Sequence, residues 1–283
     1  MAGFRARLEE ARRHKRSAVC VGLDPRFDQL PHRFDSLPPA HAILAFNREI
    51  VDATADLAVA VKPQAAFYEL YGADGYGALI ETVRYARSKG LLVIVDAKRG
   101  DIGSTAEAYA QAFLHPDGTF DADALTVNAY LGSDGVQPFL DVAAKYAKGV
   151  FVLVKTSNPS SGELQDLEIA GEPVYERMAR LVDAWDCEAV VGGTYPAQAR
   201  RARELMPRAT ILVPGYGAQG ATASDVAVSF RPDGSGAVVN NARGIIFAPD
   251  PAKAAQEMRD AMEEFLSHRR SEATPPGGIG EAR

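Results

Sequence analysis

Three charged side chains follow an apolar run near the middle of the chain, in the order Asp96, Lys98 and Asp101. The run before them, residues 93–95, has the composition of a buried strand. Alternation along a strand points Asp96 and Lys98 the same way, one step apart. Ionisable groups at the end of an apolar strand are costly to desolvate, so they are usually paired or used in chemistry. A structural ion pair and a catalytic charge cluster are the two interpretations of this segment.

A lysine held between carboxylates favours a particular chemistry. Nearby negative charge stabilises the ammonium form, which disfavours a Schiff-base nucleophile because that role needs a neutral amine. The ammonium form suits a general acid that stabilises a developing carbanion and then protonates it. A carboxylate fixed beside a substrate carboxylate would in addition favour loss of the latter as CO2. The expected general acid is Lys98, with Asp96 as the fixed carboxylate.

The rest of the chain alternates short apolar runs with helical patterns, which implies parallel strands joined by right-handed crossovers. Eight such units predict an α/β fold, the (β/α)8 TIM barrel, as a single domain over residues 1–270. Residues 271–283, rich in Pro and Gly, are predicted to be a disordered tail. The expected strands are 18–23, 57–61, 91–95, 124–127, 150–154, 189–192, 210–213 and 237–240. The expected helices are 39–55, 75–89, 104–114, 135–148, 173–184, 196–206, 222–230 and 249–269.

A TIM barrel places functional residues at the carboxyl ends of its strands and often binds phosphate after strands 7 and 8. Polar residues follow the expected strands accordingly, beginning with Asp24 and Lys62. The loop 214–220 has three glycines and Gln219, and the loop 240–244 brings Arg243, whose planar fork suits phosphate oxygens. Either loop alone could be an ordinary turn, but their joint placement predicts a monophosphate site.

Composition excludes several function classes. The formal net charge of −6 and the pI near 5.5 argue against nucleic acid or an anionic membrane as partner. The sequence shows neither a membrane-spanning apolar run nor a signal-peptide pattern, so a cytoplasmic protein is expected. Cys20 and Cys187 lie in apolar runs and are expected to be core residues. The arginines near the N-terminus, such as Arg5 and Arg12, are expected on the solvated face of a first helix.

The pattern Asp96-x-Lys98-x-x-Asp101-Ile102-x-x-Thr105 resembles the signature of the orotidine 5'-phosphate decarboxylase family. The resemblance extends over about residues 15–268 and is similar to the longer bacterial subgroup. Further matching segments are Gly22-Leu23-Asp24, Val61-Lys62-Pro63, Lys155-Thr156-Ser157, the loop 214–219 and Ala242-Arg243-Gly244. Many members of the family have Gly where this chain has Ala242, which leaves the exact shape of that loop open.

The resemblance implies decarboxylation of orotidine 5'-monophosphate (OMP) to UMP and CO2, the last step of de novo pyrimidine synthesis, without cofactor or metal. Lys98 would stabilise and protonate the carbanion at C6, and Asp96 would lie against the departing carboxylate. Lys62 and Asp101 would complete the charged array. In this family the second aspartate acts in the neighbouring subunit of a homodimer, so Asp101, Ile102 and Thr105 would act across the interface.

The resemblance also implies the substrate contacts. Asp24 and Lys62 would bind the ribose hydroxyls. Ser157 would meet the amide edge of the pyrimidine, and Pro214 would pack on the base. The 5'-phosphate would be held by Gln219, Arg243 and the backbone amide of Ala242.

Three alternatives remain open. A magnesium-dependent barrel that decarboxylates or condenses sugar phosphates would share the Asp96 motif. It would need a further carboxylate near the second strand, where Glu69 is the obvious candidate and Lys62 would oppose a cation. A catalytically inactive barrel used for binding would be expected to lack one of the charged residues. Residues 159–173 form either a lid over the nucleotide or an ordinary surface excursion.

Overall fold

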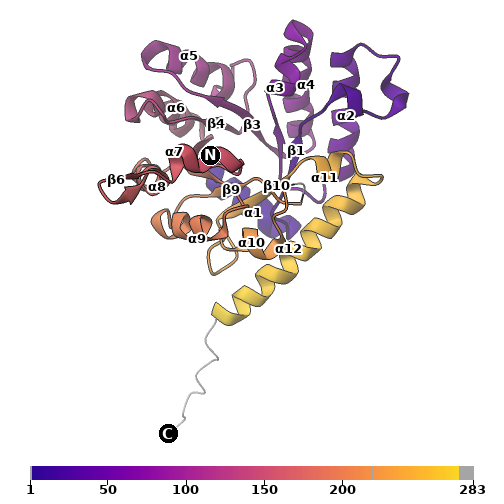
Figure 1. Ribbon diagram of the computed structural model, residues 1–283. Coiled ribbons are helices and arrows are strands. Elements are labelled where there is room, and N and C mark those ends of the chain that lie inside the picture. The colour runs from indigo at the N-terminus through magenta and orange to yellow at the C-terminus, as the bar shows by residue number, and fades with distance from the viewer. Residues whose placement is uncertain (1, 218, 274–283) are drawn as a thin grey trace.

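Eight parallel strands close into a barrel in the order β1-β10-β9-β8-β5-β4-β3-β2, which confirms the predicted (β/α)8 fold (Figure 1). The computed structural model describes residues 2–217 and 219–273. Helices surround the barrel in Figure 1, so every strand has an apolar layer on both sides. The barrel strands are β1 Val19–Leu23, β2 Ala60–Pro63, β3 Leu92–Arg99, β4 Ala124–Val127, β5 Gly149–Lys155, β8 Glu188–Val191, β9 Ile211–Val213 and β10 Ala237–Asn241.

Alternation along the strands divides the buried residues into two sets. In β1, Val19 and Val21 pack outward against the helices, whereas Cys20 belongs to the set inside the barrel. The interior set also includes Ile94 and Phe151. Both cysteines are buried and free, as expected. The residues at the carboxyl ends of the strands lie beyond this apolar interior. They therefore gather at one open end of the barrel.

The helices follow the predicted alternation with shifts of a few residues at their ends. The last helix runs to Ala273 rather than to residue 269, so three residues of the predicted tail are helical, and residues 274–283 lie outside the described part. The helices are α1 Phe4–Lys15, α2 Pro39–Thr54, α3 Ala66–Glu69, α4 Gly72–Ser88, α5 Gly103–Leu114, α6 Ser133–Tyr146, α7 Gly162–Gln165, α8 Val174–Ala184, α9 Pro196–Leu205, α10 Ala223–Ala227, α11 Arg243–Ile246 and α12 Pro251–Ala273, with the 3-10 turns η1 Phe27–Gln29, η2 His32–Phe34 and η3 Pro159–Ser161.

Two features of the strands differ from the prediction. β3 continues four residues beyond Val95, because pairing with β4 resumes at Arg99 after an irregular stretch. The segment 159–173 also has regular structure: after η3 and α7 it forms a small antiparallel hairpin of β6 Glu168–Ile169 and β7 Glu172–Pro173. The hairpin lies outside the barrel sheet.

Helix α1 closes the amino-terminal end of the barrel. Phe4 and Leu8 are buried with the interior set, and the Phe4 ring meets Phe151 edge-on at 5.7 Å between centroids. Gly149 makes room for this ring, because a Cβ there would lie 2.6 Å from Phe4 Cδ1. Apolar side chains of α1 thereby complete the core that the strands begin.

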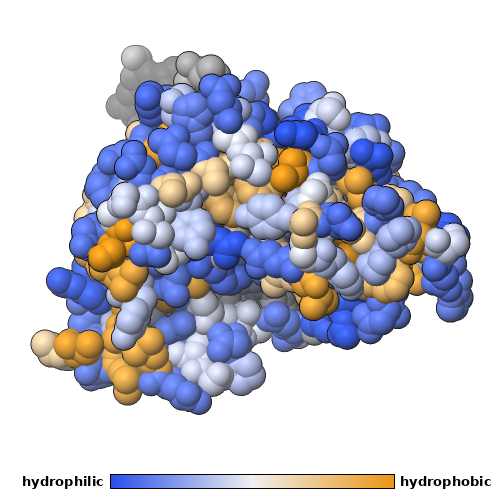
Figure 2. Space-filling model, turned by 90° about the horizontal axis from the view of Figure 1, so that it is seen from above, coloured by the Kyte–Doolittle hydropathy of each residue, from blue (hydrophilic) through white to orange (hydrophobic). Residues whose placement is uncertain are grey.

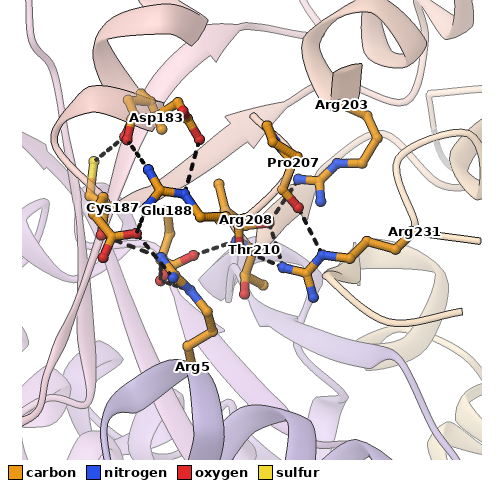
Figure 3. A network of polar contacts seen from close by, with 12 residues as sticks. Arg5, Asp183, Cys187, Glu188, Arg203, Pro207, Arg208, Thr210 and Arg231 are labelled. Carbon is orange, nitrogen blue, oxygen red and sulfur yellow. Dashed lines mark hydrogen bonds and ion pairs between the residues drawn. The ribbon is translucent and has the colours of Figure 1, made fainter. Parts of the chain in front are cut away.

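The arginines of α1 correct the expectation of a solvated face. Arg5 pairs with the buried carboxylate of Glu188, and Arg7 with that of Asp123. Arg12 is itself buried, where it pairs with Glu9 and donates to the Gly234 carbonyl. Figure 3 shows Arg5 reaching Glu188, with further arginines nearby that contact the neighbouring loops. The basic cluster is therefore largely structural, because α1 must seal the end of the barrel.

The variant Arg5→Met is expected to lower the free energy of unfolding by about 2 kcal/mol near pH 8, less than for a fully buried pair because Arg5 is 30% exposed. Burial raises the pKa of Glu188 and Arg5 opposes the rise. Without Arg5 the pKa of Glu188 in the native state rises further. At pH values between the ordinary pKa of a glutamate and this raised pKa, the native state therefore binds more protons than the unfolded state. Stability then falls as pH rises through this window, and the loss is smaller at pH 5.

Urea unfolding at pH 5 and pH 8 measures this dependence. Arg33→Met is the matched control, since it removes an exposed arginine–glutamate pair with Glu49 and should cost less than about 1 kcal/mol at either pH. An equal loss at both pH values in Arg5→Met would mean that the Glu188 charge is not responsible.

None of the helices within residues 2–217 and 219–273 is long and apolar enough to cross a lipid bilayer.

Candidate active site

A cavity of about 460 Å³ opens at the carboxyl ends of the barrel strands. It contains nine of the residues predicted from sequence. The charged ones are Asp24, Lys62, Asp96, Lys98 and Arg243. The others are Ser157, Pro214, Gln219 and Ala242. The fold therefore brings the strand-end residues and the loops 214–220 and 240–244 to one site.

The buried carboxylate of Asp96 lies at the centre of the charged cluster. Lys62 Nζ donates to Oδ2 at 2.8 Å and Lys98 Nζ donates to Oδ1 at 2.6 Å. Burial alone would raise the pKa of Asp96, but the two ammonium groups outweigh burial and hold this pKa well below its ordinary value. Burial likewise works against the charge of Lys62, yet the carboxylates of Asp96 and Asp24 keep the pKa of Lys62 above its ordinary value. Both groups are ionised at neutral pH.

Lys98 combines an unusual backbone with an accessible ammonium group. Its φ is +47°, in the left-handed region that side chains other than glycine adopt at a cost of about 1–3 kcal/mol. The side chain is 44% exposed, although Nζ is hydrogen-bonded to Asp96. Lys98 can therefore reach a ligand in the cavity and exchange protons with solvent.

Asp24 offers an unused acceptor to the cavity. Its Oδ1 is buried and has no hydrogen-bond partner among the described residues. Burial raises the pKa of Asp24 above its ordinary value, and Lys62 opposes the rise. A buried carboxylate oxygen without a partner is destabilising unless a ligand satisfies it. A hydroxyl group of a bound molecule would do so.

The loops 214–220 and 240–244 both line the cavity, together with the Asp96 cluster. Gly215 has φ +106°, and a Cβ there would lie 3.3 Å from Gln219 Oε1, so the turn depends on glycine. Ala242 packs against β1 at Gly22, where a Cβ would approach the Ala242 methyl to 2.6 Å. The extra methyl at Ala242 is thus accommodated by a glycine on the neighbouring strand.

Several polar residues of the cavity were given no role from the sequence, among them Gln64, Thr126, Asn240 and Asn241. Gln64 and Thr126 both donate hydrogen bonds to Asp96, at 3.0 and 2.8 Å. Asn240 and Asn241 are buried at the end of β10, and in the described part of the chain their Oδ1 atoms lack partners. Gln64 directly follows the matched Val61-Lys62-Pro63 segment, so its alternation with Lys62 could have indicated it. Thr126 of β4 could not be inferred from spacing, because the pairing of β3 with β4 is irregular there.

Three of the predicted site residues are not part of the cavity lining in the described part of the chain. Asp101 Oδ1 accepts a hydrogen bond from the backbone N–H of Ile102 at 2.8 Å. Ile102 is 53% exposed, and Thr105 is exposed on α5. The single chain does not bring these residues to Lys98.

The excursion after β5 is tied to the site by a buried lysine. Lys155 donates to Asp166 at 2.7 Å and to Ser161 at 3.0 Å. Gln165 exchanges hydrogen bonds with the backbone N–H and the hydroxyl of Thr156. These contacts fix the start of the segment next to Ser157, while β6 is exposed and β7 is half-buried.

Glu69, the candidate metal ligand of the magnesium-dependent alternative, is engaged elsewhere. Its carboxylate pairs with the guanidinium of Arg99. Glu69 also does not belong to the described lining of the cavity. The geometry does not favour that alternative.

The chain is similar to known proteins over most of its length. Residues 17–258 match the profile of the "Orotidine 5'-phosphate decarboxylase / HUMPS family". An orotidine 5'-phosphate decarboxylase of Rhodopirellula baltica is 46% identical over 272 residues, which cover 88% of this chain and 89% of the relative. The chain belongs to the orotidine 5'-phosphate decarboxylase family. This confirms the resemblance seen in the motifs.

Other members of the orotidine 5'-phosphate decarboxylase family agree with this assignment. A relative of that name from Halorubrum lacusprofundi is 49% identical over 245 residues, covering 82% of this chain and 83% of the relative. The solved structure of Leishmania donovani OMP decarboxylase is 36% identical with a TM-score of 0.80, and the match covers 95% of this chain and 99% of that one. The similarity thus includes the barrel as a whole.

Proposed function

We propose that the cavity converts OMP to UMP and CO2 through the array of Lys62, Asp96 and Lys98. The chain is accordingly a carboxy-lyase, and the sugar-phosphate alternative is not favoured. The observation that carries the mechanism is the ionised, buried Asp96 held by two lysines in a cavity that the loops 214–220 and 240–244 also line. One cavity thus holds a cluster for charge development and the residues proposed for the phosphate.

In the proposed reaction the bond from C6 to the carboxylate breaks and its electron pair remains on C6. Lys98 stabilises that carbanion electrostatically and transfers one Nζ proton to it, after which water reprotonates the amine. Asp96 cannot readily accept a proton, because its pKa is held low, so it stays negative beside the departing carboxylate. Release of CO2 removes the like charge from its vicinity.

Substrate contacts in this proposal follow the family roles. Asp24 and Lys62 bind the ribose hydroxyls, which the unpartnered, buried Asp24 Oδ1 supports among the described residues. Ser157 meets the pyrimidine amide edge and Pro214 packs on the base. Gln219, Arg243 and the Ala242 backbone amide hold the 5'-phosphate, whose binding energy contributes to lowering the barrier.

We further propose that Asp101, Ile102 and Thr105 complete the site of a second subunit in a homodimer. Their position outside the cavity of their own chain supports this. Ile102 is also close to Leu131, since both lie about 3–4 Å from the Cβ position of Gly135, and Tyr130 beside them is 79% exposed. Exposed apolar residues in such a group are typical of an interface. On the face in Figure 2 the apolar residues form separate patches among hydrophilic ones.

The activity is tested by following the ultraviolet absorbance of OMP with excess EDTA. Conversion to UMP with release of CO2 is the expected result, since the proposed chemistry uses only side chains and water. No conversion, with or without added Mg2+, would contradict the proposal. The cytoplasmic location and the domain limit at residue 270 stay predictions, and residues 159–173 stay predicted as either a lid or a surface excursion.

A further inference from the structure

The pairing of β3 with β4 is interrupted where the charged residues lie. Val95 pairs with Leu125, and the next pair is Arg99 with Val127. Between these two pairs β3 therefore has two more residues than β4. The extra length bends β3 at Asp96, Ala97 and Lys98. The backbone N–H of Lys98 consequently has no regular ladder acceptor opposite it.

Thr126 of β4 fills this interruption with its side chain. Its hydroxyl accepts a hydrogen bond from Lys98 N at 2.9 Å and donates one to Asp96 Oδ1 at 2.8 Å. One hydroxyl proton and one lone pair satisfy both contacts, as the chemistry of a threonine allows. Thr126 is buried, so its geometry is fixed by packing. A single side chain thus connects the backbone of the lysine to the carboxylate of the aspartate.

We propose that Thr126 is a positioning residue for the decarboxylation, whose hydroxyl fixes the Asp96 carboxylate and the strained Lys98 backbone in their working arrangement. The inference rests on the proposed function of the site. Oδ1 of Asp96 receives both Lys98 Nζ and the Thr126 hydroxyl, so the hydroxyl determines which lone pair remains for the lysine. Gln64 acts on the other oxygen, Oδ2, together with Lys62.

The hydroxyl also explains how the left-handed conformation of Lys98 persists. A residue with φ +47° is retained only where neighbouring groups over-determine it. The hydrogen bond from Lys98 N to Thr126 fixes one end of the peptide unit, and the bond from Nζ to Asp96 fixes the side chain. Loss of the first bond would release the backbone while leaving the cavity residues that bind nucleotide in place.

The test compares Thr126→Val, which has the same shape without the hydroxyl, with Thr126→Ser, which retains it. Thr126→Val should lower kcat for OMP about 10- to 100-fold, because small misplacements of catalytic groups have effects of this size, with the Kd of UMP within about threefold of wild type. Thr126→Ser should recover kcat to within about threefold, since both hydrogen bonds can form. Thr54→Val is the matched control, because Thr54 is buried and donates to Ile50 O in α2.

The outcomes separate this inference from the proposed function. If the wild type is active and the kcat of Thr126→Val is within threefold of the wild-type value, the inference is overturned and the proposed function is not. The same holds if the kcat of Thr126→Ser is no higher than that of Thr126→Val. A wild type that does not convert OMP overturns the proposed function and this inference with it. If Thr126→Val does not fold, Thr126→Cys replaces it with the same criteria, because a thiol is a weak donor and acceptor.

Discussion

Replacing Lys98 with alanine is expected to abolish decarboxylation while nucleotide binding remains measurable. The ammonium group serves twice in the proposed mechanism, as electrostatic partner of the carbanion and as its proton source. General acid catalysis contributes about 10²–10⁴-fold and a preorganised electrostatic partner about 10²–10³-fold, so kcat should fall by at least about 10⁴-fold. The Kd of UMP should change less than about tenfold, because the proposed phosphate ligands Gln219 and Arg243 and the ribose ligand Asp24 are unchanged.

Steady-state kinetics and calorimetric titration with UMP measure the two effects. Lys89→Ala is a suitable control, because Lys89 is an exposed lysine whose partner, Asp52, is on the outer helices. Turnover of Lys98→Ala within tenfold of wild type would remove Lys98 from the role of proton donor.

The second large effect is expected from mixing two inactive proteins. Lys98→Ala and Asp101→Ala subunits each lack one residue of the shared site. In a heterodimer one site carries both changes and the other carries neither. Random exchange makes half of the dimers mixed, so the mixture should recover about a quarter of wild-type activity.

Subunit exchange must be shown independently, for example by mass spectrometry of differently tagged chains. Mixing each variant with itself provides the background rate. An exchanged mixture without recovery would place Asp101 in its own subunit's chemistry or outside the reaction altogether.

The barrel could be predicted because its signal is repeated along the chain. Eight apolar runs separated by helical patterns specify one architecture even when each boundary is off by a few residues. β4 matches its predicted bounds, whereas β3 extends to Arg99 because its pairing with β4 resumes there after an interruption. Irregular pairing has no local signature, so the longer strand could not be inferred.

The charged residues of the cavity could also be predicted, since charge at the end of an apolar strand is conspicuous. Thr126 could not be, because a threonine in an apolar strand is an ordinary β-former until its partner is known. The arginines of α1 show the opposite error. Charge suggested solvent exposure for Arg12, yet its partner Gly234 lies 222 positions away and long-range partners cannot be read from spacing.

The sealing of the barrel by α1 has a consequence for synthesis of the protein. Helix α1 contacts residues that are synthesised much later: Arg7 pairs with Asp123, Arg5 with Glu188 and Arg12 with Gly234. At about 5–20 residues per second, a ribosome needs ~10–50 s to deliver all of them. Throughout that interval Phe4 and Leu8 lack the interior that buries them. The closed barrel can therefore form only after Gly234 and β10 have been synthesised.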